Sequence, residues 1–217
     1  MDLIELLPAF WVGFKMTLLL LVISGTASLV FGTIITAMRI SPIGSLRVFA
    51  TVWTEIGRNT PLTLVFYFFV FVVPFFGLRW DWNFYTILAI CALTYYTSPF
   101  VAEALRSGIN GVPVGQAEAA RSIGLGFGQT VSLVVLPQAF RMTIPPLINV
   151  FIALTKNSSV AGGFFVVDLF ASTRTLANGH GDLVIPILII AAAFYLVITV
   201  PLGLLAARLE KKLVVQR

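Results

Sequence analysis

The sequence predicts an all-α integral membrane protein in which the whole chain, residues 1–217, forms a single transmembrane domain. Two observations lead to this prediction. Hydrophobic residues make up 59% of the chain and charged residues only 11%, with a mean hydropathy of +0.99, so the chain has too few polar residues to cover a surface in water. Its apolar runs are also longer than the ~20 residues that a helix needs to cross a hydrocarbon core of ~30 Å.

Five apolar runs are expected to cross the membrane as helices, because backbone groups in lipid must be hydrogen-bonded within the segment. The five predicted spans are residues 10–38, 48–76, 84–105, 142 to about 167, and 183–207. Pro61 in the second span and Pro145 and Pro146 in the fourth predict kinks, since proline removes a backbone donor and crowds the preceding turn.

The first run has a competing interpretation, a cleaved signal peptide. Its apolar stretch is longer than the usual ~7–15 residues, and no small-residue cleavage site follows it. We therefore favour a membrane span.

Basic residues predict the orientation, because cytoplasmic loops are enriched in Lys and Arg. With the N-terminus outside and the C-terminus in the cytoplasm, only Arg79 and Arg174 lie on the outer face. The basic residues then expected at the cytoplasmic face are Arg39, Arg47, Arg106, Arg121, Arg141, Arg208, Lys211, Lys212 and Arg217.

Several classes of function are disfavoured. The sequence contains no Gly-Lys dipeptide, which excludes a phosphate-binding loop of the Walker type. His180 and Cys91 are the single residues of their types and predict neither a metal site nor an internal disulfide. The net charge of +5 is spread over loop ends, so lipid headgroups explain it better than nucleic acid does.

Between the third and fourth spans, at about residues 107–136, lies a predicted cytoplasmic loop rich in small and charged residues. It carries Glu118-Ala119-Ala120, then Gly124 after three residues, and after nine more a Val134-x-Leu-Pro sequence. A chain this apolar has little reason to carry such a segment unless a soluble partner docks there.

Polar residues inside the second and fourth spans are candidates for a substrate pathway, because each is costly in lipid unless it is paired or faces water. Arg58 is expected about 15 Å along the second span and Lys156 about 21 Å along the fourth, at ~1.5 Å per residue. Arg58 could instead pair with Glu55, and Lys156 with Glu55 or Glu103. The candidate pathway residues are Arg58, Asn59, Thr60, Asn149, Lys156, Asn157, Ser158 and Ser159.

The stretch from residue 168 to residue 182 is expected to be an external polar loop. It could be an inert connection or could receive a substrate-delivering protein.

Together these motifs resemble the polar amino-acid uptake branch of the ABC importer permeases, with the type I importer fold, over nearly the whole chain. The matching sequences are Arg-x-Thr-Pro-Leu at residue 58, the Glu-Ala-Ala segment, Leu-Pro-Gln-Ala at residue 136, Pro-Pro-Leu at residue 145 and Ile-Ala-Leu-x-Lys at residue 152. The resemblance implies that the Glu-Ala-Ala segment is a coupling loop that fits a cleft on a cytoplasmic ATPase. The coupling residues it implies are Gly115, Gln116, Glu118, Ala119, Ala120, Arg121 and Gly124.

The resemblance also implies the partners and cofactors. We expect a second permease subunit in a homo- or heterodimer, two ATP-binding subunits and an external solute-binding protein. The chain itself is not expected to be an enzyme or to bind a cofactor, because ATP and Mg would be used by the partner subunits. Two other classes remain as alternatives: a gradient-driven carrier or channel, and a membrane subunit that anchors or signals to an ATPase without transporting.

Two departures from the family pattern bear on the substrate. The family commonly has Arg-Gly-Thr-Pro and Lys-Asp-Thr-Ser, where this chain has Arg58-Asn59-Thr60-Pro61 and Lys156-Asn157-Ser158-Ser159. Because Asn157 replaces an acid, Lys156 is freer to attract an anion. We predict glutamate or aspartate as the substrate. The sequences around Arg58 and Lys156 are similar to those of actinobacterial glutamate-uptake permeases. A neutral polar or basic amino acid is the alternative.

Overall fold

The computed structural model describes residues 3–77 and 83–214, and helices are the only regular elements in these ranges. Arg79 and Arg217, whose charges contribute to the predicted orientation, lie outside the described residues. The elements are α1 (Leu3–Arg39), α2 (Gly44–Asn59), α3 (Leu62–Tyr67), the π-helical turn η1 (Phe68–Val72), α4 (Val73–Phe75), α5 (Phe84–Asn110), α6 (Val114–Ser122), α7 (Phe127–Gln129), the π-helical segment η2 (Thr130–Val135), α8 (Leu136–Asn157), the 3-10 helix η3 (Ser158–Gly163), α9 (Leu169–Gly179), the 3-10 turn η4 (Gly181–Leu183) and α10 (Val184–Val214).

The predicted spans correspond to four long apolar helical segments and one broken span. By length and composition, the four that can cross a membrane are Leu3–Arg39, Phe84–Asn110, Phe127–Gly163 and Gly181–Lys212. The fifth is the pair Gly44–Asn59 and Leu62–Phe75, which meet at a bend of 103°.

The bend in the second span is sharper than the predicted kink, and it lies at the proline that predicted it. Thr60 and Pro61 are both extended, with ψ of 131° and 132°. A residue before proline is pushed out of the helical region by the proline ring, so two extended residues separate α2 from α3. The span is therefore broken rather than curved.

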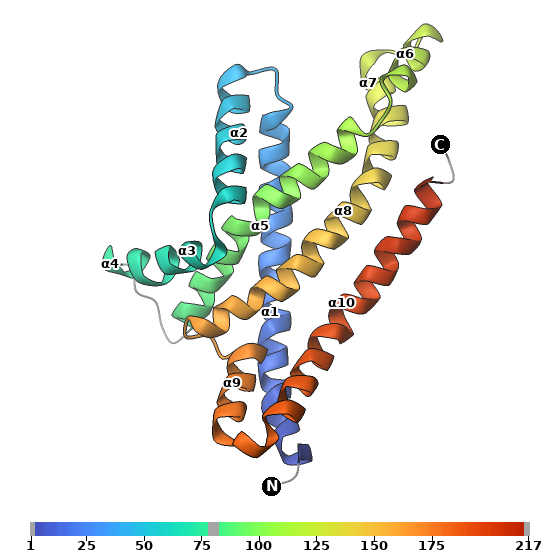
Figure 1. Cartoon of the computed structure of the whole chain (residues 1–217). Coiled ribbons are helices and arrows are strands. Elements are labelled where there is room, and N and C mark those ends of the chain that lie inside the picture. Colours follow the sequence, from blue (N-terminus) through green and yellow to red (C-terminus); the bar gives the residue numbers. More distant parts are fainter. Residues whose placement is uncertain (1–2, 78–82, 215–217) are drawn as a thin grey trace.

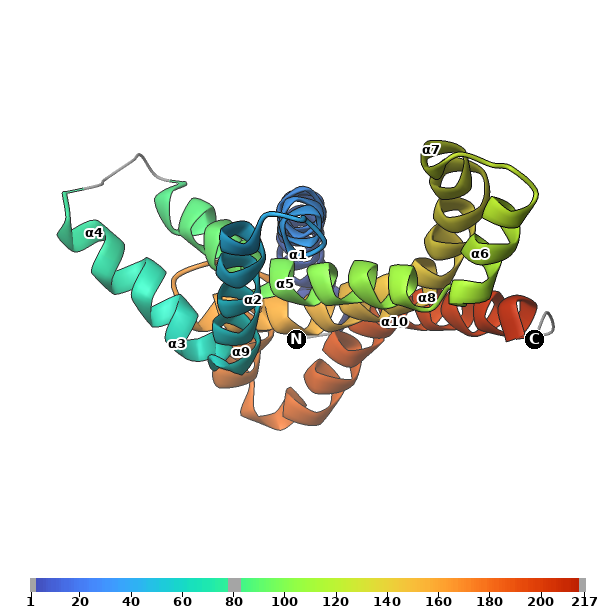
Figure 2. The same ribbon diagram turned by 90° about the horizontal axis from the view of Figure 1, so that it is seen from above.

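Figure 1 shows the long helices as a slanted bundle with α5 and α8 crossing in front of α1. The N-terminus and α9 lie at one end, and α6, α7 and the C-terminus at the other. Seen from above in Figure 2, α3 and α4 extend to one side of the bundle and the α6–α7 hairpin to the other. An odd number of spans explains why the termini lie at opposite ends.

Two boundaries differ from the sequence-based expectation. The helix of the fourth span begins at Phe127 rather than near residue 142, because α7, η2 and α8 follow one another without a break. The expected polar loop at residues 168–182 is wrong in its conformation. Most of it is the helix α9, which packs against α1 and α10.

Helix α5 is the centre of the bundle and packs against α1, α2 and α8. The largest buried cluster joins α5 to α1, to the α3–η1 half of the broken span and to the segment after η3; its core includes Leu20, Phe66, Leu93, Leu154 and Phe164. At the other end, Leu6, Phe10 and Phe14 of α1 are buried with residues of α9 and α10. The first apolar run is thus an integral part of the bundle, which disfavours its interpretation as a signal peptide.

Asp168 fixes the start of α9. Its side chain is fully buried, and its Oδ1 accepts a hydrogen bond from the Ala171 N–H at 2.8 Å, as an N-cap does. The Leu169 N–H donates to Thr17 Oγ1 of α1 at 3.1 Å. Among the described residues, Asp168 Oδ2 has no hydrogen-bond partner. Burial raises the pKa of the Asp168 carboxyl to about 7.

We expect this carboxyl to make the protein less stable as the pH rises. An acid whose pKa is raised on folding stabilises the folded state most below its unfolded pKa of about 3.9, and this stabilisation is lost as the pH rises toward 7, by at most about 1.4 kcal/mol per pH unit. Asp168→Asn keeps the capping oxygen without the charge, so it should flatten this part of the profile. Thermal unfolding of the purified protein from pH 5 to pH 8 measures the effect.

Asp182→Asn is the matched control, because Asp182 is exposed. It should leave the profile of the wild-type protein in place. Asp168→Ala should flatten the profile as Asp168→Asn does, and it should be less stable than Asp168→Asn by about 0.5–2 kcal/mol at every pH through the missing cap. Identical profiles for the wild type and Asp168→Asn would contradict a neutral buried carboxyl.

Candidate functional site

The predicted coupling residues gather on α6 and the turn that follows it, at the far end of the molecule (Figure 1). Of these residues Ala120 is buried, in the hairpin that α6 forms with η2. The others are exposed: Gly115, Gln116, Glu118, Ala119, Arg121 and Gly124. The face that the sequence assigned to a partner is therefore open in the isolated chain.

The shape of this hairpin follows from its sequence. Pro113 precedes the first turn of α6, where its missing N–H costs nothing. At the other end the Leu125 N–H donates to the Ala120 carbonyl at 3.2 Å and the Gly124 N–H to the Arg121 carbonyl at 3.0 Å, the two bonds of a Schellman motif. Gly124 has a φ of +92°, which a side chain would disfavour.

A pocket of about 320 Å³ between α5 and α8 brings together two of the predicted pathway residues, Asn149 and Asn157. This volume is at the lower end of the range for small-molecule sites. The remaining lining is mostly apolar: Tyr96, Thr97, Phe100, Val150, Ala153 and Leu154. The two amides are eight residues apart on α8, about 12 Å at ~1.5 Å per residue, so polar groups mark both ends of an apolar wall.

Thr97 adds an unsatisfied polar group to this pocket. The residue is 3% exposed, and its Oγ1 has no hydrogen-bond partner among the described residues. A buried hydroxyl without a partner is costly, so such groups point to a ligand or an ordered water. Because the Thr97 oxygen is itself inaccessible, the pocket surface offers two amides in apolar surroundings, which suits a small molecule with polar ends.

The break in the second span lines a second pocket of about 360 Å³, which contains Thr60 and Tyr95. Its other lining residues are apolar: Leu64, Val65, Phe68 and Phe69. Thr60 Oγ1 donates to the Ile56 carbonyl at 2.7 Å, which satisfies its hydroxyl within α2.

Arg58 and Asn59 form side-chain contacts at the end of α2. Asn59 Nδ2 donates to the Glu55 carbonyl at 2.8 Å. Arg58 Nη1 lies 3.8 Å from Oε2 of Glu103 on α5. The pairing of Arg58 with Glu55, one of the alternatives from the sequence, is not formed among the described residues.

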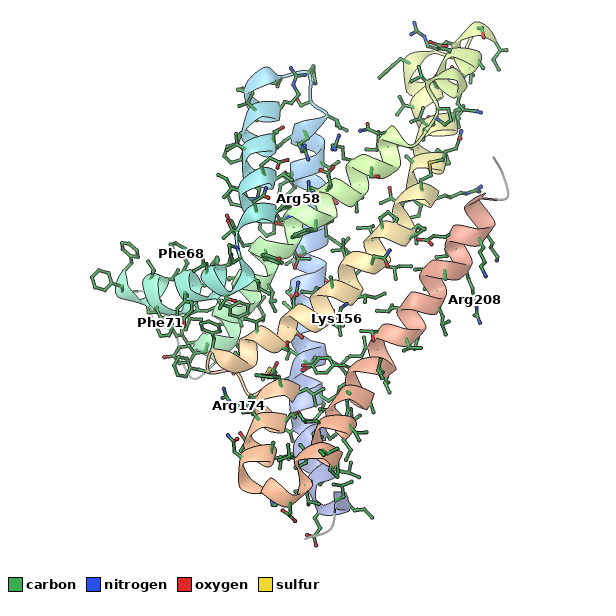
Figure 3. The ribbon with its side chains drawn as sticks, in the orientation of Figure 1. Arg58, Phe68, Phe71, Lys156, Arg174 and Arg208 are labelled. Carbon is green, nitrogen blue, oxygen red and sulfur yellow. The ribbon has the colours of Figure 1, made fainter. Side chains whose placement is uncertain are left out.

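Lys156 lies on α8 near the middle of the molecule (Figure 3). It is exposed and, within residues 3–77 and 83–214, forms no ion pair with either Glu55 or Glu103. Because it is seven residues after Asn149, it lies on the same side of α8 as that residue. It precedes the lining residue Asn157 in the chain and is not itself part of the pocket lining. Ser158 and Ser159 donate to the carbonyls of Thr155 and Lys156 at 2.8 and 2.7 Å, so their hydroxyls serve the helix end.

Sequence reasoning missed the α5 side of the pocket and the cluster around Glu103. Tyr96 and Phe100 are four residues apart and so share a helix face, but in an apolar span this spacing does not distinguish a pocket from packing. The described residues contain no group of three or more His, Cys, Asp or Glu side chains that could hold a metal ion.

Comparisons with known proteins show the family to which the chain belongs. Residues 28–215 match the family described as the inner membrane component of binding-protein-dependent transport systems. The chain belongs to this family. It is therefore a multi-pass inner-membrane permease of the ABC importers, and neither an enzyme nor a gradient-driven carrier; ATP hydrolysis is the task of a separate subunit.

Individual relatives cover almost the entire permease. The chain is 42% identical to the glutamate transport system permease protein GluC of Corynebacterium glutamicum, over 98% of this chain and 96% of that one. It is also 42% identical to the probable glutamine ABC transporter permease protein GlnM of Bacillus subtilis, over 93% and 91%. A crystal structure of an amino acid ABC transporter with histidines superimposes with a TM-score of 0.87 at 29% identity, over 98% of this chain and 99% of that one. The predicted all-helical permease fold is confirmed, whereas the orientation of the two termini stays a prediction.

The turn at Gly124 yields a prediction. Gly124→Ala should loosen α6, because a side chain at positive φ costs about 1–2 kcal/mol while the space around its Cβ is open. Amide hydrogen exchange along α6 should then be roughly 5- to 30-fold faster. Gly124→Asn should have a smaller effect, since Asn tolerates this conformation better than Ala does.

Gly115→Ala is the matched control, because a Cβ there also meets open space and the backbone is helical. This change should slow the exchange of α6, since Ala favours a helix over Gly by ~1 kcal/mol. Equal exchange in the two Ala variants would contradict the assignment of strain to Gly124.

Proposed function

We propose that this permease imports an acidic amino acid, glutamate or aspartate, across the bacterial cytoplasmic membrane. The observation that carries the proposal is the pocket between α5 and α8, with Asn149 and Asn157 in its wall and the exposed Lys156 next to Asn157 in the chain. The two amides suit the polar ends of a free amino acid. An unpaired lysine nearby attracts the second carboxylate that glutamate and aspartate carry.

The assembly we propose contains a second, similar permease, two ATP-binding subunits and an external solute-binding protein. ATP and Mg would be bound by the ATP-binding subunits. Glu118, Ala119 and Arg121 on α6 would meet the ATPase, because this face is exposed and combines small residues for close approach with charges for pairing. ATP-driven rocking of the two permeases would then open the pathway to each side in turn.

The orientation we propose has α6 and the C-terminus in the cytoplasm and the N-terminus outside. Arg208 lies on the half of α10 that leads toward the C-terminus and is closer to α6 than Arg174, which lies beside α9 in the lower part of the view (Figure 3). This arrangement supports the orientation that the basic residues predict, because the larger group of Lys and Arg is on the side of α6.

A neutral polar amino acid such as glutamine is the second candidate. The pocket wall itself carries no charge, and GlnM of Bacillus subtilis, named as a probable glutamine permease, is as similar in identity as GluC is. The charge at Lys156 separates the two candidates.

The test is uptake by the assembled transporter with Lys156→Met. Losing a charge-assisted contact of about 1.5–3 kcal/mol should lower glutamate uptake roughly ten-fold or more and leave glutamine uptake nearly unchanged. Competition of labelled glutamate uptake by a panel of unlabelled amino acids should show displacement by aspartate and not by lysine or arginine.

Lys15→Met is the matched control, because Lys15 is an exposed lysine on α1 and does not line the pocket. It should leave both uptake rates unchanged. Displacement of glutamate by lysine, or an equal loss of glutamate and glutamine uptake in Lys156→Met, would refute the acidic substrate.

A further inference from the structure

Three arginines from three helices surround the carboxylate of Glu103 on α5. Arg39 at the end of α1 donates from Nη1 to Glu103 Oε2 at 2.7 Å. Arg106, one turn further along α5, pairs with Oε1. Arg58 at the end of α2 lies 3.8 Å from Oε2, beyond hydrogen-bond distance. Figure 3 shows Arg58 beside the junction of α2 and α3.

This cluster lies where α5 is packed most closely against its neighbours. A Cβ on Gly32 of α1 would come within 2.5 Å of Val101, and one on Gly57 of α2 within 2.5 Å of Pro99. A Cβ on Gly108 of α5 would likewise come too close to Thr143 of α8. Because these contacts bracket Glu103 along α5, the helix backbones there have little freedom to slide independently.

The same helix leads directly to α6. Only residues 111–113 separate the end of α5 from the first turn of α6. A displacement of α6 is therefore passed first to the last turns of α5, which carry Glu103 and Arg106. From Glu103 it can reach α1 through Arg39 and the broken span through Arg58.

The negative charge of Glu103 holds the three arginines together. Three guanidinium groups lie within 4 Å of one carboxylate, so removing the carboxylate charge leaves three like charges facing one another. Glu55 of α2 is close enough to act on Arg106, but it forms no ion pair with the three arginines. Repulsion would then drive the ends of α1 and α2 away from α5.

The contacts differ in how easily they break. The Arg39 side chain is 11% exposed and hydrogen-bonded, whereas that of Arg58 is 37% exposed and lies at the longer distance. Partly exposed ion pairs contribute little to overall stability. The Arg58 contact can therefore form and break during a cycle without unfolding the bundle. It adjoins the Thr60–Pro61 break, the most sharply bent point among the candidate spans.

We infer that Glu103 is a positioning residue that transmits the movement of α6 to α1 and to the broken second span, and so couples ATP hydrolysis to opening of the pathway. This inference rests on the proposed docking of an ATPase on α6. It assigns a role to Glu103 through Arg39 and Arg58, and none in contact with the substrate.

The experiment uses the complete transporter, with its permeases, ATP-binding subunits and binding protein, reconstituted in liposomes. Amino-acid uptake and ATP hydrolysis are measured on the same preparation. Glu103→Gln should keep the assembly and its ATP hydrolysis while uptake per ATP falls roughly 5- to 150-fold, the range typical of coupling between distant sites. Glu103→Asp keeps the charge and should recover most of the uptake.

Glu210→Gln is the matched control, since Glu210 is exposed near the end of α10, and it should behave as the wild type. A fall of uptake and hydrolysis together, with loss of the assembled complex, would show a purely structural role and overturn the inference. Unchanged uptake per ATP in Glu103→Gln would also overturn it while leaving the proposed function intact. If the wild-type assembly took up no amino acid at all, both would fail.

Discussion

Helix α5, from Phe84 to Asn110, places three features on one continuous helix, in which Pro99 removes a single backbone hydrogen bond. Tyr96, Thr97 and Phe100 line the pocket, Glu103 gathers the arginines of three helices, and Asn110 ends within four residues of α6. In lipid no water is present to replace the backbone hydrogen bonds of a helix, so α5 does not fray easily. A displacement of the end of α5 is therefore transmitted along the helix.

The second span shows the opposite design. Pro61 removes a backbone donor and pushes Thr60 into an extended conformation, which lets the Leu62–Phe75 half extend to one side of the bundle. Such a break is tolerated in a membrane where the freed groups face protein or a cavity, and the pocket beside Thr60 provides that setting. One continuous helix and one broken helix, joined by Glu103 and Arg58, form the pair on which the proposed coupling depends.

Much of the fold could be predicted from the sequence, because long apolar runs leave no alternative to membrane helices. The position of the break followed from Pro61, but its angle did not, since the angle depends on how α3 packs. The helix α9 was missed because residues 168–182 read as polar, whereas Asp168 caps the helix and is buried against α1 and α10. The Glu103 cluster was missed because Arg39 and Glu103 are 64 residues apart and meet only in the folded bundle.

Of the candidate site, the residues on α6 and the amides of the pocket could be named from motifs alone. Their partners on α5 could not be named, because an aromatic residue in an apolar span has the same appearance whether it packs or lines a cavity. Family membership adds the ABC importer fold and the separate ATPase subunit. It leaves the choice between glutamate and glutamine to the charge at Lys156.

The central claim is that α6 faces the cytoplasm, where an ATPase can reach it. The most direct measurement is labelling of Ser122→Cys on the exposed end of α6, in a Cys91→Ser background, with a maleimide that cannot cross the membrane. Arg174→Cys on α9 reports the opposite face. We expect Ser122→Cys to react in inside-out vesicles and to stay unlabelled in intact cells, with the reverse for Arg174→Cys. Labelling of Ser122→Cys in intact cells would contradict the account.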